Sequence, residues 1–189
     1  GNHRALLDVA EIGPEYQPGH AHADTLSFEL SLFGQRLFVN SGTSQYGTGP
    51  IREYQRSTRA HNTVEIDDEN SSEVWSGFRV ARRAYPSNIS ANSKDDILLV
   101  SAVHNGYLRL AGKVLTRRTW MFDSCSIRIV DELRGDYSRA VSRLYCHPTI
   151  KVNQFNKSNI LLILPEGHEV LFSVEGASIL RVVDSSWHL

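Results

Sequence analysis

Cysteine and methionine are almost absent from this chain of 189 residues. Two cysteines, Cys125 and Cys146, are too few for the disulfide scaffold that stabilises many small secreted domains, so we expect ordinary buried thiols. The single methionine is Met121, and the first residue is Gly1. A chain that does not begin with an initiator methionine is expected to be a fragment of a larger protein.

An excess of charge of one sign and long apolar runs are also lacking. The chain has 20 Lys and Arg against 21 Asp and Glu, and these are interspersed, so the composition does not predict a nucleic-acid partner. No apolar run approaches the roughly 20 residues that span a bilayer, and no signal-peptide pattern opens the chain. The hydrophobic fraction of 41% is enough for a core. We therefore expect one domain, residues 1–189, with no membrane span.

Apolar residues at helical spacing are nearly absent, whereas alternating apolar and polar residues recur along the whole chain. Turn residues such as Gly34 and Gly167 separate the alternating segments, as in antiparallel hairpins. Many short strands in one domain predict an all-β fold, an antiparallel β-sandwich of two stacked sheets. The expected strand segments are 5–12, 25–33, 35–40, 62–67, 96–103, 113–122, 126–133, 142–147, 159–165, 169–174 and 178–183.

One long segment between strands, residues 41–60, is rich in Gly, Ser, Thr, Arg and Tyr. Loops of this length in a compact domain are usually functional or mobile. The aromatic residues Trp75, Phe78 and Trp120 lie outside it and are expected to pack in the core, since aromatics on strands most often do.

The segment "HAHAD" places His20, His22 and Asp24 at every second position. In an extended strand these three side chains share one face, opposite two small alanines. Two imidazoles at this spacing can reach one zinc ion, with a third ligand such as His61 or Asn40 from elsewhere. The residues alone leave a hydrogen-bonded structural role equally open.

Longer motifs carry a family resemblance: "GHAHADTLSFELSLFGQRLFVNSGT", Tyr46, "REYQRSTRAHNTVEID" and "HNGY" at 104–107. They resemble the β-domain of the heparinase II/III-like polysaccharide lyases, densely from Leu6 to Val80 and sparsely as far as His147. The resemblance implies a C-terminal β-sandwich, an N-terminal helical toroid in the same protein, and an acidic polysaccharide bound between them. Such lyases cleave uronic-acid polymers by β-elimination, and those that degrade external polymers are periplasmic or secreted.

The resemblance also implies roles for individual residues. Tyr46 is similar in position to a tyrosine that acts as acid and possibly as base, and His20 is expected to face the substrate. Since a free tyrosine has a pKa of about 10, the reaction needs a cationic neighbour, for which Arg52 and Arg56 are candidates. Both arginines are also expected to bind the acidic substrate. His104 either contacts substrate in the cleft or has a structural role beside the turn at Gly106.

The family's zinc would be held by His22, His61 and an aspartate at the position where this chain has Asn40. A neutral amide oxygen is a poorer zinc ligand than a carboxylate, which puts the metal in doubt. Asp24 replaces the missing carboxylate only if the strand bends to point it inward. Without metal, the two histidines and Asn40 form a hydrogen-bonded cluster that supports the loop of Tyr46.

Three functions remain open at this point. The chain is the β-domain of a lyase that is nearly inactive without its helical partner; a non-catalytic carbohydrate-binding or scaffolding module; or part of a protein in bacterial surface-polysaccharide assembly. The uronic acid, the linkage, the internal or terminal mode of cutting and the oligomeric state do not follow from the sequence.

Overall fold

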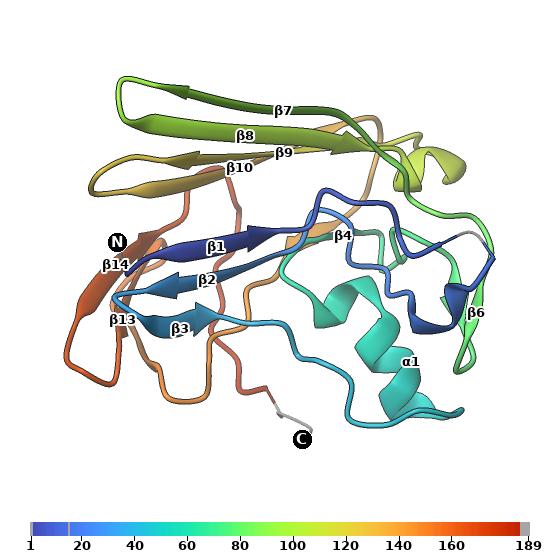
Figure 1. Ribbon diagram of the computed structural model, residues 1–189, viewed down its shortest axis with the longest axis horizontal. Helices are drawn as coiled ribbons and strands as arrows, with labels where there is room; N and C mark the ends of the chain where they lie inside the picture. The colour runs from blue at the N-terminus through green and yellow to red at the C-terminus, as the bar shows by residue number, and fades with distance from the viewer. Residues whose placement is uncertain (1, 15, 186–189) are drawn as a thin grey trace.

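The computed structural model describes residues 2–14 and 16–185, which form a β-sandwich with additional small sheets. One layer is a four-stranded antiparallel sheet in the order β10-β9-β8-β7, at the top of Figure 1. Its strands are β7 (Pro86–Lys94), β8 (Ile97–His104), β9 (Leu115–Phe122) and β10 (Ile127–Arg134).

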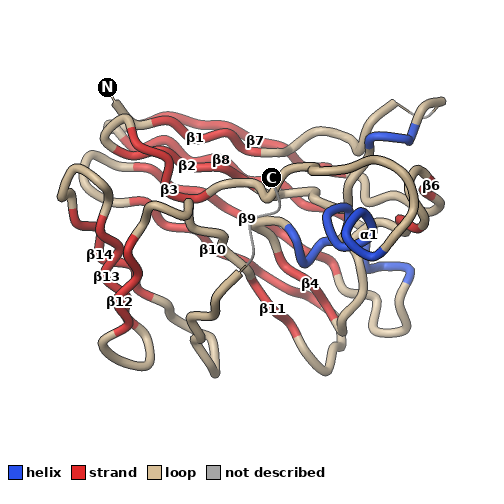
Figure 2. Tube along the Cα trace, turned by 90° about the horizontal axis from the view of Figure 1, so that it is seen from below, coloured by secondary structure: helices blue, strands red, loops and turns tan. Residues whose placement is uncertain are grey.

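The second layer is divided between two three-stranded sheets, β1-β2-β3 and β12-β13-β14. Figure 2 shows β12, β13 and β14 at the end of the molecule opposite α1. Every pairing between these strands is antiparallel, which confirms the expected all-β antiparallel fold. The strands are β1 (Arg4–Leu7), β2 (Phe28–Leu32), β3 (Gln35–Phe38), β12 (Lys151–Gln154), β13 (Asn159–Ile163) and β14 (Glu169–Ser173).

Several short elements accompany the main layers, and three of the candidate site residues lie in them: His20 in η1, and Arg52 and Arg56 in α1. Two two-stranded sheets, β4 with β11 and β5 with β6, lie outside the main layers. No helix among the described residues is long and apolar enough to cross a membrane. The short elements are η1 (Pro18–His20), α1 (Pro50–Arg56), η2 (Thr58–Ala60), β4 (Val64–Ile66), β5 (Val74–Trp75), β6 (Arg79–Val80), η3 (Gly106–Arg109) and β11 (Ala140–Ser142).

The main core fills the space between the layers and follows from the alternation in the sequence. Phe28 and Leu30 of β2 alternate with residues of the other face, and Trp120 of β9 is fully buried, as predicted. Ile160 and Leu162 of β13 join the same cluster. At the β2–β3 turn, Gly34 has a φ of 77°, which a residue without a Cβ adopts easily.

Several expectations about elements were wrong. Segment 178–183 forms no strand, and segment 142–147 contributes only the end of β11 and an isolated bridge from Cys146. The polar strand β7 was not expected, because its sequence has no apolar alternation. Cys125 is exposed in the β9–β10 turn, so it is not a buried thiol.

The segment 41–60 is more structured than a loop. It contains α1 and η2, and Pro50 begins the helix immediately after Gly49. Proline is favoured in the first helical turn because its missing N–H would have no intrahelical partner there. The Gly49–Pro50 pair is therefore the signal that was available for this helix.

Candidate active site and metal centre

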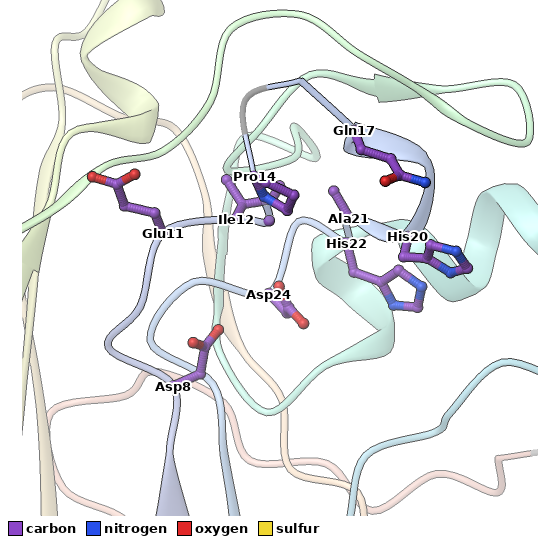
Figure 3. Close-up of a pocket in the computed structure, with 10 residues that line it drawn as sticks. Asp8, Glu11, Ile12, Pro14, Gln17, His20, Ala21, His22 and Asp24 are labelled. Atoms are coloured by element: carbon purple, nitrogen blue, oxygen red, sulfur yellow. The ribbon is translucent and has the colours of Figure 1, made fainter.

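The "HAHAD" segment is not the strand edge that its alternation indicated. His20 ends the 3₁₀ turn η1, and residues 21–24 are irregular up to the approach to β2. Ala21 and Ala23 are buried as expected, and the Ala23 amide donates to the carbonyl oxygen of Arg56 at 2.8 Å. The segment is thus fixed against α1, with its polar side chains around a cavity of about 380 Å³ (Figure 3).

His22, Asp24 and His61 form a compact group. One potential ligand atom from each lies within 4.8 Å of the others, and the two imidazole centroids are 5.2 Å apart. Ligand atoms of a tetrahedral zinc site lie roughly 3.4 Å apart for bonds of about 2.1 Å, so a modest inward movement would complete the set. The bend in the backbone brings Asp24 to the place where a carboxylate ligand is needed.

His61 shows most directly that the group suits a metal. Its side chain is fully buried, and Nε2 donates to the carbonyl oxygen of Gln55 at 3.1 Å. This assignment leaves a lone pair on Nδ1, which has no hydrogen-bond partner in the described part of the chain. A metal-bound histidine typically donates its other N–H to a carbonyl in this way.

The electrostatics of the group keep both imidazoles neutral. Burial lowers the pKa of His61 to about 4, and burial together with the nearby positive groups lowers the pKa of His22 to about 3. Burial also raises the pKa of Asp24 to about 6. At neutral pH the group therefore offers two uncharged nitrogen ligands and an ionised oxygen ligand.

His22 has a second set of contacts that belongs to the hydrogen-bonded alternative. Arg52 Nη1 lies 3.1 Å from His22 Nε2, and Thr43 Oγ1 lies 3.3 Å from the same nitrogen. Because an arginine side chain only donates, Nε2 accepts this hydrogen bond. The His22 imidazole thus connects the group of His22, Asp24 and His61 to the loop that carries Tyr46.

Asn40 lies at the edge of the same region. It lines a smaller cavity together with Asp8 and Asp24, while its Oδ1 accepts from the amide of Gly42 at 2.8 Å. Asp8 is an acidic neighbour that sequence reasoning missed; burial and the charge of Asp24 raise its pKa to about 7. In the sequence, Asp8 is marked only by being a polar residue within the largely apolar segment 5–12.

Tyr46 and His20 lie together on the surface. Tyr46 is 62% exposed, His20 is also exposed, and their rings meet edge-on with centroids 5.5 Å apart. The Arg52 guanidinium lies 5.2 Å from the centre of the Tyr46 ring, so the predicted cationic neighbour is present.

The guanidinium groups of Arg52 and Arg56 are buried beneath this pair. Arg52 donates to the carbonyl oxygen of Gly77 at 3.2 Å, and Arg56 donates to that of Ala21 at 3.0 Å. Both side chains are almost inaccessible to solvent. This placement favours a role in positioning the site and argues against direct contact of either arginine with a polysaccharide.

His104 lies apart from the other candidate residues. It is 1% exposed, and its Nδ1 accepts from the amide of Gly106 at 3.1 Å. A Cβ on Gly106 would approach the Ser71 carbonyl oxygen to 2.3 Å, so this turn is tightly packed. The burial supports the structural alternative and argues against contact between His104 and substrate.

Trp75 and Phe78 contradict the prediction that they lie in the core, since each is 47% exposed. They belong to the β5–β6 hairpin, whose strands have two residues each and leave little room for an interior face. Phe78 lies beside Tyr46, with parallel rings whose centroids are 6.5 Å apart. Sequence reasoning had no signal for this neighbour, because the two residues come from different elements.

The family model for the heparinase II/III-like, C-terminal domain matches residues 1–189. The chain belongs to this family. Among solved structures, the fold is similar to a heparan sulfate lyase HepC mutant from Pedobacter heparinus, with a TM-score of 0.71 and 16% identity over 92% of this chain and 26% of that chain. It is also similar to the heparinase III BT4657 gene product, with a TM-score of 0.62 and 22% identity over 79% of this chain and 22% of that chain.

At these identities the structural likeness shows a shared fold alone. The chain spans about a quarter of the length of the solved heparinases that it matches. A search of the curated proteins gave no match.

Proposed function

We propose that this chain is the β-domain of a polysaccharide lyase that cleaves a uronic-acid polymer by β-elimination, in a cleft shared with a helical domain of the same protein. The observation that carries the proposal is the exposed pair of Tyr46 and His20, with the Arg52 guanidinium 5.2 Å from the tyrosine ring. Membership of the heparinase II/III-like family supports it.

The pair has the chemistry that the elimination requires. We assign His20 as the base that takes the C5 proton of the uronate and Tyr46 as the acid that protonates the leaving oxygen at C4. The C5–H and C4–O bonds break, a C4–C5 double bond forms, and the carboxylate delocalises the intermediate negative charge. Transfer of the proton from His20 to the tyrosine phenolate then restores both groups.

Arg52 supports this chemistry from below the surface. Its guanidinium lies 5.2 Å from the centre of the Tyr46 ring, so a positive charge is present beside the ring that carries the proton-donating hydroxyl. Its hydrogen bonds to Thr43 Oγ1 and to the carbonyl oxygens of Gly77 and Gly19, at 3.2, 3.2 and 3.3 Å, hold the charge in place. Arg56 supports the site indirectly, by donating to backbone carbonyl oxygens of the "HAHAD" segment and of the β5–β6 hairpin.

We further propose that His22, Asp24 and His61 hold a divalent metal such as zinc. The unpartnered Nδ1 of His61 and the nearby carboxylate of Asp24 support this assignment. When bound, the ion would neutralise the buried carboxylate and fix the two imidazoles. Its role would be structural, since these residues hold the segment that presents His20.

The decisive test is Tyr46→Phe in the full-length protein, assayed by ultraviolet absorbance of unsaturated uronate over a panel of acidic glycans. The change keeps the ring and removes the hydroxyl, so we expect kcat to fall by about 10² or more while substrate binding stays nearly constant. Tyr137→Phe is the matched control, because Tyr137 is 45% exposed in a turn on another part of the molecule.

Retention of most of the turnover by Tyr46→Phe would remove Tyr46 as acid or base. The non-catalytic binding or scaffolding module would then be the better function, whether the glycan is foreign or belongs to the cell's own surface. The isolated β-domain is expected to be nearly inactive, because elimination needs several groups acting together and loss of one such group commonly costs about 10² to 10³ in rate.

A further inference from the structure

The β5–β6 hairpin exposes aromatic surface that the core does not use. Trp75 and Phe78 are each 47% exposed, although both are large apolar side chains. A hairpin with two residues in each strand is not stable by itself in water. The rest of the domain must therefore hold it in place.

Two buried arginines supply this support. Arg56 donates to the carbonyl oxygens of Trp75 and Ser76 at 3.2 and 2.9 Å, and to that of Arg79 at 3.1 Å. Arg52 donates to that of Gly77 at 3.2 Å. Burying guanidinium groups is costly unless they are fully hydrogen-bonded, and here the hairpin backbone provides a large part of the acceptors.

The tip of the hairpin is packed directly against the loop of Tyr46. A Cβ on Gly77 would lie 1.9 Å from the carbonyl oxygen of Gly47, so the two backbones touch. This contact aligns Phe78 with Tyr46: the ring planes differ by 2° and the centroids are 6.5 Å apart. His20 packs edge-on against the same tyrosine.

A positive charge accompanies these rings. Arg79 follows Phe78 directly and is exposed, and no carboxylate of the described residues lies within ion-pair distance of its guanidinium. Its backbone carbonyl is held by Arg56, which fixes the position of its Cα. An exposed ring followed directly in the chain by an exposed guanidinium supplies the two kinds of group that bind a sugar ring with a carboxylate or sulfate.

We propose that Phe78 and Arg79 form a sugar-binding subsite beside Tyr46, in which Phe78 packs on the apolar face of a pyranose and Arg79 pairs with its acidic substituent. This proposal rests on the proposed lyase function. In it, the subsite holds the polymer next to the reacting sugar. The short distance from Phe78 to the proton-transfer pair favours a glycan over a protein surface as the occupant.

The experiment measures binding by calorimetry in the full-length protein. The probes are size-defined oligosaccharides from a mannuronate polymer and from a sulfated glucosamine–uronate polymer, each with a carboxyl-reduced and desulfated counterpart. Variants are Phe78→Ala and Arg79→Gln. Phe155→Ala and Arg128→Gln are the matched controls, because both residues are exposed and lie outside the hairpin.

Phe78→Ala is expected to raise Kd about tenfold for acidic and neutral probes alike, since stacking is lost for both, and to raise KM more than it lowers kcat. Arg79→Gln is expected to raise Kd for the acidic probes only and to reduce the salt dependence of binding. The two controls should leave binding unchanged. Fluorescence of Trp75 should respond to the probes, and Trp75→Phe should abolish that response.

Unchanged affinity in Phe78→Ala, or no binding by the unaltered protein, would overturn the subsite. A fall in melting temperature without a change in Kd would overturn it too, and would assign Phe78 to contact with another part of the protein. The two proposals fail in different measurements. Retained turnover in Tyr46→Phe would contradict the proposed reaction, whereas unchanged Kd values in the hairpin variants would contradict the subsite.

Discussion

His61 combines complete burial with a ring nitrogen that has no partner among the described residues. An unsatisfied buried polar atom costs about 1 to 3 kcal/mol. Because His104 Nε2 and Trp120 Nε1 also lack a partner among the described residues, the missing partner alone does not set His61 apart; its neighbours do. The nearby carboxylate of Asp24 is a second potential ligand for a cation bound at this nitrogen of His61. At the level of single residues, His22, Asp24 and His61 therefore form a group that could bind a metal.

This arrangement predicts how metal content responds to two substitutions. Asn40→Asp should raise zinc affinity about tenfold because it adds a charged oxygen at the smaller cavity that Asp24 also lines, while Asp24→Asn should lower it by a similar factor. Both are measured by metal analysis after dialysis and by the zinc-induced shift in melting temperature. Asn92→Asp, on the exposed strand β7, is the control.

Two results would show that the metal centre is wrongly placed. One is full zinc content in Asp24→Asn, and the other is zinc that survives the loss of both His22 and His61.

His104 predicts a pH dependence of stability. Burial lowers its pKa to about 4, against 6.5 in the unfolded chain, so below pH 6.5 the unfolded state binds a proton that the folded state does not. Its contribution to stability is thus lost as the pH falls from 6.5 toward 4, by roughly 2 kcal/mol at pH 5.

His104→Asn should remove that loss while keeping an acceptor for the Gly106 amide. Urea unfolding at pH 7 and pH 5 should show a smaller difference between the two pH values in the variant than in the unaltered chain. His168→Asn, at an exposed position, should leave the difference as it is. An equal pH effect in both variants would contradict the assignment.

At the scale of elements, α1 and the β5–β6 hairpin depend on each other. Arg56 belongs to α1 but its guanidinium reaches the backbone carbonyls of the hairpin, which has too few residues to be stable alone. Arg56→Lys keeps the charge and loses the planar fork of donors. We expect a loss of about 2 to 4 kcal/mol, since several buried carbonyls lose their partners.

Hydrogen exchange locates the effect of that substitution. Amides in residues 74–80 should exchange much faster in Arg56→Lys, while those of β8 and β9 should change little. The substitution Arg59→Lys is the control, because the partly exposed Arg59 pairs with buried Glu65 and exposed Asp68, which lie outside the hairpin. Uniform acceleration over the whole chain would mean that Arg56 supports the global fold instead.

The same elements show what the sequence could and could not predict. Strands β2 and β13 follow from alternation because one face of each lies on the core. Strand β7 has almost no buried positions, so no apolar pattern marks it. The helix α1 has seven residues and buries Arg52, Gln55 and Arg56, so its stability comes from tertiary hydrogen bonds that a local pattern does not contain.

The candidate site could likewise be predicted from the sequence only in part. The family resemblance, and not the histidine spacing alone, predicted that His22 and His61 share one polar group, and the structure brings them together. The position of Asp24 beside His22 and His61 depends on a backbone bend, and the exposure of Phe78 depends on contact with a distant loop. Neither can be derived from residue spacing, because both result from how separate segments pack.

At the scale of the whole molecule, Arg118 connects the two layers of the sandwich. It lies on β9, pairs with Asp131 of β10 at 2.6 Å, and donates to the carbonyl oxygen of Leu26 at 2.9 Å in the approach to β2. It also donates to the Asn62 carbonyl oxygen. The side chain is 1% exposed, so these bonds are protected from water.

Arg118→Met should lower the free energy of unfolding by about 3 to 5 kcal/mol, because it leaves Asp131 without its partner. The double variant with Asp131→Leu should recover part of this loss. Arg117→Met is the control, as its pair with Glu132 is surface-exposed and such pairs contribute about 0 to 1 kcal/mol. Equal destabilisation by the two single variants would contradict the role of Arg118 as a bridge between layers.

The contact between Gly77 and Gly47 also limits how this protein can diversify. Any side chain at position 77 would collide with backbone, so descendants of the chain can vary the hairpin tip only while retaining glycine there. Positions 75, 78 and 79, which face solvent, are free of that constraint. Directed evolution toward a new glycan should therefore accumulate substitutions at these three positions on an unchanged backbone, whereas insertions in either loop should be eliminated.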